Sequence, residues 1–173
     1  SIHPKYKTPG FSTLVTGAAE RLGQEALAFY LRVGGARFEA KALQALGLTR
    51  LRVGRQAEAL ADLSRAVDLF RQHGMPADSA EAVAWLAWSR WLCGLAEQAR
   101  ADIEDLLAKG LPQVPAINVL FNVHRVLQAL GDSRAATYLA AAHERLQQLA
   151  KHIADPVERD RWLHGSDLHR ALV

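Results

Sequence analysis

The chain has 173 residues, half of them hydrophobic, and a formal net charge of +3 that arises from 21 basic and 18 acidic residues mixed along the sequence. Its 31 alanines and 26 leucines far outnumber its 15 valines and isoleucines, which favours helices and argues against an all-β fold. The single cysteine, Cys93, excludes an internal disulfide framework and a paired-cysteine metal site.

The predicted elements, taken in chain order, are an arm, a helix, three helix pairs and a closing helix. Residues 1–17 contain Pro4, Pro9 and Gly10 and predict a flexible arm, and residues 18–173 predict one helical repeat domain. After a first helix at 18–33, glycines and prolines interrupt the helical periodicity every roughly 14 to 20 residues, which is typical of antiparallel helices joined by tight turns. The pairs are expected at 36–74, 78–110 and 114–153. A C-terminal cap is expected over 156–172: a capping helix for which Asp155 is a favourable N-cap and Pro156 a favourable first helical residue, and then a last short turn over 166–172.

The three helix pairs repeat one another. Turn glycines recur at intervals of 40 and 37 residues: Gly54, Gly94 and Gly131. A small residue follows each of these glycines by five positions: Ala59, Ala99 and Ala136. The matching position on the first helix of each pair holds Gly47, Ala87 and His124. We expect the two helices of a pair to cross closely at the small residues, and each pair to bury its apolar face against its neighbours.

This pattern resembles the tetratricopeptide repeat, a helix–turn–helix unit of about 34 residues. In the first pair the following residues fill the family's positions: Leu43, Leu46, Gly47, Gly54, Ala59 and Ala66. The family's aromatic residue after the small one is replaced by Arg50, Arg90 and Leu127. The longer period implies longer helices, similar to those of bacterial regulators. The resemblance implies an all-α solenoid, a right-handed superhelix of about three repeats with an N-terminal helix and a C-terminal cap.

In this family the first helix of each pair lines a concave groove that holds a peptide or a helix. Carried over position by position, the resemblance implies these groove residues: Lys41, Gln44, Leu48, Leu51 and Arg52, then Trp88 and Trp91, then Asn118, Phe121, Asn122, Arg125 and Gln128. Aromatic side chains would supply contact area and polar ones would fix the register of the partner. The alternative is that Trp88 and Trp91 pack inside the array. Trp85 is expected to face the second helix of its pair, in the core.

The acidic, histidine and cysteine residues that could carry catalysis or bind a metal are more simply explained by surface or packing roles. The chain lacks a glycine-rich phosphate loop, and its seven histidines lack the spacing of a helical metal site, so we expect no enzyme, no cofactor and no metal. Asp102, Glu104 and Asp105 are expected on a solvated helix face, and Cys93 is expected to pack as a small hydrophobe. His124 and His143 are expected to hydrogen-bond inside the third pair.

The sequence therefore indicates a protein–protein interaction or scaffold module, the regulatory or partner-binding domain of a larger bacterial signalling or transcription regulator. Its partner would be a protein, a peptide or another domain of the same chain, in the concave groove. The alternative is a sensor of a small effector, with an aromatic pocket between Trp88, Trp91, Phe121 and Arg125. Direct nucleic-acid contact is not expected, because the basic residues form no run.

We expect a cytoplasmic protein without a membrane partner. No segment approaches the roughly 18 uncharged apolar residues of a membrane span, and the polar N-terminus has no apolar signal-peptide core. A homodimer is an open alternative, because the N-terminal end of the repeat array has no evident polar cap.

Overall fold

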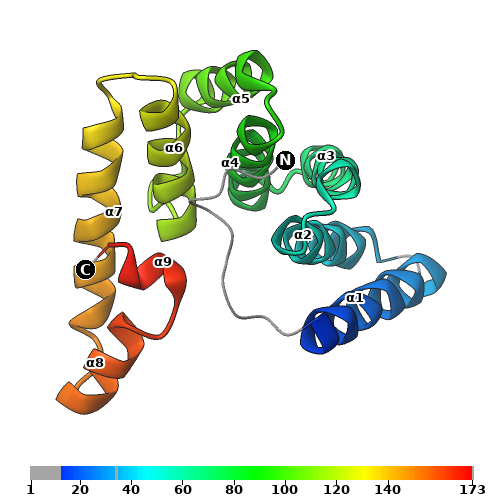
Figure 1. The fold of residues 1–173 in the computed structure, drawn as a ribbon, viewed down its shortest axis with the longest axis horizontal. Coiled ribbons are helices and arrows are strands. Elements are labelled where there is room, and N and C mark those ends of the chain that lie inside the picture. The colour runs from blue at the N-terminus through cyan, green and yellow to red at the C-terminus, as the bar shows by residue number, and fades with distance from the viewer. Residues whose placement is uncertain (1–12, 34, 173) are drawn as a thin grey trace. The chain divides into compact units, whose positions relative to one another are not determined.

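The computed structural model describes residues 13–33 and 35–172, so the first twelve residues of the predicted arm lie outside the described residues. In the described part the regular structure is entirely helical, without a strand (Figure 1). The helices have these bounds: α1 (Thr13–Val33), α2 (Ala36–Arg52), α3 (Gln56–Gln72), α4 (Pro76–Leu92), α5 (Ala96–Lys109), α6 (Ile117–Ala129), α7 (Ala135–Ala150), α8 (Pro156–Leu163) and α9 (Asp167–Arg170). The predicted all-α class is confirmed, and α1 begins five residues before the predicted start at 18.

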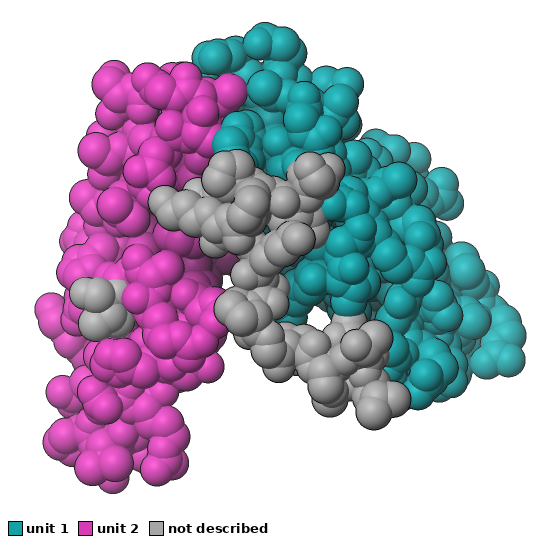
Figure 2. All heavy atoms as spheres, viewed as in Figure 1, with its two compact units in different colours: residues 1–112 teal, residues 113–173 magenta. Residues whose placement is uncertain are grey.

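The contacts group these helices into two compact units, residues 1–112 and 113–173, where the sequence predicts one domain (Figure 2). The boundary follows α5, whose C-cap residue Gly110 has a positive φ of 82°. Two prolines, Pro112 and Pro115, then lie between α5 and α6. Proline lacks an amide donor and disfavours helix in the residue before it, so helical structure resumes only at Ile117.

Within each unit, helices that follow one another in sequence pack against one another in a solenoid-like manner. In unit 1, α1 packs on α2, α2 on α3, α3 on α4 and α4 on α5. In unit 2, α6 packs on α7, and α8 contacts both α7 and α9. None of the helices that the structure describes is long and apolar enough to cross a membrane.

In the described part of the chain, α2, α3, α4 and α6 end in the same hydrogen-bonded turn, the Schellman motif. At the end of α2, Gly54 has φ 84°, and the backbone N–H of Arg55 donates to the carbonyl oxygen of Arg50 at 2.9 Å. Helices α3, α4 and α6 repeat this pattern around their own positive-φ glycines: Gly74, Gly94 and Gly131. Only glycine adopts this conformation at low cost, which is why the glycine spacing located the turns.

The close crossings predicted for the first two pairs are present. A Cβ added to Gly47 would lie 3.0 Å from Leu63 Cγ and 3.3 Å from the Ala59 carbonyl oxygen, so α2 and α3 touch there without room for a side chain. In the second pair, Ala87 on α4 and Ala99 on α5 are both fully buried.

The prediction that Ala136 marks the crossing of the third pair is wrong by one residue. Ala136 is exposed, whereas Ala135 is buried and its carbonyl oxygen accepts a hydrogen bond from His124 Nδ1 at 2.9 Å. The reason is the turn before α7. The backbone N–H of Ala135 bonds the Asp132 carbonyl three residues back, whereas that of Ala59 bonds Arg55 four residues back. The tighter turn uses one residue fewer.

Helix α8 begins as predicted. The Asp155 Oδ1 accepts hydrogen bonds from the backbone N–H groups of Val157, at 2.7 Å, and Glu158, at 3.3 Å, and Pro156 occupies the first helical position. Further along, His143 on α7 donates from Nδ1 to the carbonyl oxygen of Leu172 at 2.7 Å. The expectation that His143 bonds inside the third pair is therefore wrong. It holds the chain after α9 instead.

Candidate interaction surface and pocket in unit 1

The predicted groove residues of the first two pairs lie on α2 and α4, which contact each other within unit 1. Hydrogen bonds between described side chains connect these helices. Lys41 Nζ donates to Asp78 Oδ1 at 2.9 Å, and Gln44 Nε2 donates to Glu81 Oε1 at 3.1 Å. Both bonds join residues that are 37 positions apart, so the two helices run alongside each other in a constant register.

The next turn of each helix continues this register with apolar side chains. Leu48 follows Gln44 by one turn on α2, and Trp85 follows Glu81 by one turn on α4. Both Leu48 and Trp85 are half-buried, so part of each side chain faces solvent. One further turn along α2 lies Arg52, which is exposed, whereas the neighbouring Leu51 is buried. We call Lys41, Gln44, Leu48, Arg52, Glu81 and Trp85 the α2–α4 face.

Of the two placements considered for Trp88, the structure shows packing inside the array, whereas Trp85 is only half-buried and not fully in the core as expected. Trp88 is 3% exposed and stacks on the half-buried Trp91, with ring centroids 5.0 Å apart and planes 11° apart. Trp88 therefore belongs to the packing, and Trp85, expected in the core, is the more accessible of the two. The reason is that α4 contacts α2, α3 and α5, so side chains on most of its circumference are covered.

The groove residues predicted from the third pair lie on α6, in unit 2. The Arg125 guanidinium lies over the Phe121 ring, 4.9 Å from its centroid, and also donates to Asn122 Oδ1. Asn122 is buried, Asn118 is half-buried and Gln128 is exposed. On α6 the structure thus brings Phe121, Asn122 and Arg125 together in a cation–π and hydrogen-bonded group.

Two equivalent Arg–Asp ion pairs hold the helix pairs of unit 1 together. Arg50 Nη1 lies 2.6 Å from Asp62 Oδ2, and Arg90 Nη1 lies 2.5 Å from Asp102 Oδ1. Each pair joins the first helix to the second across 12 residues, at the position of the missing family aromatic. Burial raises the pKa of Asp62 and of Asp102, and the nearby arginines offset this only in part. Sequence reasoning missed these pairs, although the 12-residue spacing occurs in both copies.

The arginines near the α2–α3 turn are mostly engaged by carboxylates. Besides Asp62, Arg50 lies 3.4 Å from Glu20 Oε1 on α1, and Arg55 pairs with both Glu20 and Glu58. These hydrogen bonds lower the pKa of Glu58 and raise that of Arg55. The charge of this cluster is therefore largely compensated locally, which makes it a poor phosphate-binding surface.

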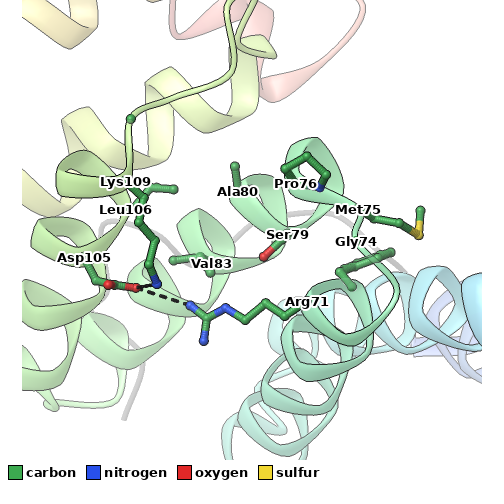
Figure 3. A pocket seen from close by; sticks show the side chains of 12 residues that line it. Arg71, Gly74, Met75, Pro76, Ser79, Ala80, Val83, Asp105, Leu106 and Lys109 are labelled. Carbon is green, nitrogen blue, oxygen red and sulfur yellow. Dashed lines mark hydrogen bonds and ion pairs between the residues drawn. The ribbon is translucent and has the colours of Figure 1, made fainter.

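A pocket of about 360 Å³ opens between the C-terminal ends of α3 and α5 and the N-terminal end of α4 (Figure 3). Its floor is apolar and buried: Phe70, Met75, Ala80, Val83 and Leu106. At the rim, Arg71 Nη2 lies 3.4 Å and Lys109 Nζ lies 2.7 Å from Asp105 Oδ2, and the Ser79 hydroxyl points inward. Sequence reasoning missed the pocket because it joins turns more than thirty residues apart, at Gly74 and Gly110.

The other acidic residues and the cysteine that were considered for chemistry lie in ion pairs, on the surface or partly packed. Asp102 and Asp105 are both in ion pairs with basic side chains, and Glu104 is exposed. Cys93 is half-buried, and burial raises the pKa of its thiol, which disfavours the reactive thiolate. Among the residues that the structure describes, no group of three or more His, Cys, Asp or Glu side chains could hold a metal ion.

Comparison of the chain with models of protein families and with curated proteins found no match in either case. The α2–α4 face and the pocket of unit 1 each expose polar and apolar groups together.

Proposed function

We propose that the chain is a helical-repeat interaction module of the tetratricopeptide kind, which binds a peptide or helix of a protein partner on the α2–α4 face. Support comes from successive helix pairs with the same Schellman turn and close crossings at small residues. In a larger bacterial regulator of signalling or transcription, such a face would carry the contact with a partner or a neighbouring domain.

The observation that carries the proposal is the order of side chains along the α2–α4 face. A polar section, with Lys41 and Gln44 bonded across to α4, is followed by the half-buried Leu48 and Trp85 and then by the exposed Arg52. Apolar and aromatic side chains give an interface its area, while flanking polar groups set its register. We infer that the partner has an apolar anchor for Leu48 and Trp85 and an acidic residue for Arg52.

The test uses a displayed library of random 12-residue peptides, selected on the full chain. Binding of the selected peptides is then measured by calorimetry for Leu48→Glu, Arg52→Glu and a matched charge reversal on an exposed arginine of α5, Arg100→Glu. Leu48→Glu should weaken binding by about tenfold or more, because a carboxylate then replaces an apolar contact. Arg52→Glu should weaken it less, and Arg100→Glu should leave it unchanged.

Circular dichroism of each variant confirms that its helices are retained. Selected peptides that bind all three variants as tightly as the original chain would place the site elsewhere and contradict the proposal.

A second candidate function, binding of a small effector, is favoured by the pocket between α3, α4 and α5. This pocket is lined by none of the residues of the aromatic pocket considered from sequence. Its volume is near the lower end for small-molecule sites, and its two rim cations against one rim carboxylate suit an apolar molecule with one carboxylate. Decanoate serves as the probe. It should bind the original chain and lose about tenfold in affinity with Arg71→Ala/Lys109→Ala, and equal affinity for both would exclude this site.

A further inference from the structure

Helix α1 has two different faces. One face contacts α2: a Cβ added to Gly23 would lie 3.2 Å from Leu46 Cδ1, and Tyr30 stacks on Phe38 with ring centroids 5.1 Å apart. The other face exposes large apolar side chains, since Leu22 is 66%, Phe29 is 49% and Val33 is 60% exposed. Single exposed apolar residues are ordinary, but an aligned series indicates an interaction surface.

The exposed series has the spacing of a coiled-coil seam. It consists of the exposed Ala19, Leu22, Phe29 and Val33 and the half-buried Ala26, at alternating intervals of three and four residues. At 100° per residue, these five positions fall within an arc of about 80°, beside the face that packs on α2. We call them the α1 seam. Such a seam fits another helix with the same spacing.

We propose that the α1 seam pairs with the α1 seam of a second copy of this chain, antiparallel and about a two-fold axis. In this arrangement Leu22 lies opposite Val33 of the second copy, and Ala26 lies opposite Phe29 of the second copy. Each large side chain of the centre therefore meets a small one. A parallel arrangement would place Phe29 against itself and Ala26 against itself, leaving one layer crowded and the next one empty.

The charges beside the seam favour the same arrangement. Glu25 and Arg32 are both exposed, and they immediately precede the seam residues Ala26 and Val33. Antiparallel pairing brings Glu25 of one copy near Arg32 of the second copy, twice across the two-fold axis. A self-complementary surface of this kind identifies the occupant as a second copy. This pairing is independent of the α2–α4 face.

The interface is short. The seam spans 15 residues, about 22 Å of helix, so its buried area falls below that of a standard protein interface. We therefore expect a dimer that dissociates in the micromolar range.

Sedimentation velocity of the full chain, from about 1 to 200 μM, tests the pairing. The original chain should shift from monomer to dimer over this range, and Phe29→Glu should remain monomeric throughout. Leu31→Glu is the matched control, because Leu31 is 57% exposed on α1 but lies outside the seam. A chain that stays monomeric, or a dimer that tolerates Phe29→Glu or is equally weakened by Leu31→Glu, would overturn the proposal.

A charge exchange and a crosslink test the direction of pairing. Glu25→Arg should weaken the dimer, and adding Arg32→Glu should restore it. In a Cys93→Ser background, mixing Leu22→Cys with Val33→Cys should give a disulfide between the two variants. A disulfide formed as readily by Leu22→Cys alone would show parallel pairing and refute the register.

Discussion

The helix pairs of unit 1 and the pair of unit 2 share their turn but differ where the helices cross. In unit 1 a small residue, Gly47 or Ala87, lies at the crossing. In unit 2 the same position holds His124, which hydrogen-bonds the Ala135 carbonyl. The turn before α7 is also tighter by one residue. A larger crossing residue is thus accommodated by a changed entry into the second helix and by a hydrogen bond that satisfies the imidazole.

The same two regions differ in a second way. Unit 1 joins its helices with Arg–Asp ion pairs, whereas the equivalent positions of unit 2 hold Leu127 and Tyr138. Leu127 is fully buried. The turn glycines are nevertheless alike in all three pairs, with φ between 71° and 84°. The backbone turn is therefore compatible with either a charged or an apolar contact between the helices.

The largest effect on stability is expected from placing a large residue at the helix crossing of unit 1. Unit 2 has a large residue at this position, but it also has the tighter turn that unit 1 lacks. Gly47→Leu places a branched side chain where even a Cβ is 3.0 Å from Leu63 Cγ. We expect a loss of about 3 kcal/mol in the free energy of unfolding, since overpacking forces helices apart. Urea denaturation followed by circular dichroism measures it. A loss below about 1 kcal/mol would mean that α2 and α3 separate easily.

The second largest loss of stability is expected from a substitution at the helix crossing of unit 2. His124→Ala removes a buried ring and leaves the Ala135 carbonyl without its donor, which should cost about 2 to 3 kcal/mol of unfolding free energy. His152→Ala is the matched control. Its Nδ1 makes a hydrogen bond of the same length, 2.9 Å, to the Gln148 carbonyl, but the side chain is exposed. Equal losses in thermal unfolding would show that burial of His124 contributes nothing.

A third experiment replaces an Arg–Asp ion pair of unit 1 by the apolar residues found at the equivalent positions of unit 2. Asp102→Ala leaves Arg90 half-buried without its carboxylate and should cost about 2 kcal/mol of unfolding free energy. The double variant Arg90→Leu/Asp102→Tyr copies the residues of unit 2 and should recover most of this loss, because an apolar pair often replaces a buried ion pair without cost. A double variant no more stable than Asp102→Ala would show that the contact depends on the geometry of its unit.

The smallest effect is on the pH dependence of stability. Burial raises the pKa of Asp102 above its ordinary value of 3.8, so the folded chain binds this proton more tightly than the unfolded chain. The contribution of Asp102 to stability is therefore greatest at low pH and is lost as pH rises through the folded-state pKa. Asp102→Asn should lack this decrease when unfolding is measured from about pH 4 to pH 7. An identical pH profile would contradict the shift.

The sequence predicts the helix bounds well where glycine is required. A positive φ at Gly94 or Gly131 is costly for other residues, so these glycines mark helix ends independently of tertiary structure. The N-cap at Asp155 was predictable for a similar reason, since its hydrogen bonds are local. Close crossings at Gly47 and Ala87 followed from residue size.

The burial of individual side chains depends on tertiary contacts, which the helical periodicity of the sequence does not reveal. The position of Ala135 depends on a turn shortened by one residue, which no helical pattern reveals. The partial exposure of Trp85 and the burial of Trp88 depend on α4 being covered by three helices. Apolar residues lie on all sides of such a helix, so these two tryptophans look alike in sequence. The pairing of Arg50 with Asp62 was accessible, because the spacing recurs in Arg90 and Asp102.

The placement of the tryptophans has a spectroscopic consequence. Trp85, Trp88 and Trp91 all lie on α4 in unit 1, and the remaining one, Trp162, lies on α8 in unit 2 with its ring 4.4 Å from that of His169. The emission of a Trp162→Phe variant therefore reports on unit 1 alone. The difference from the original chain reports on unit 2, so the natural sequence already carries separate optical labels for the melting of its two units.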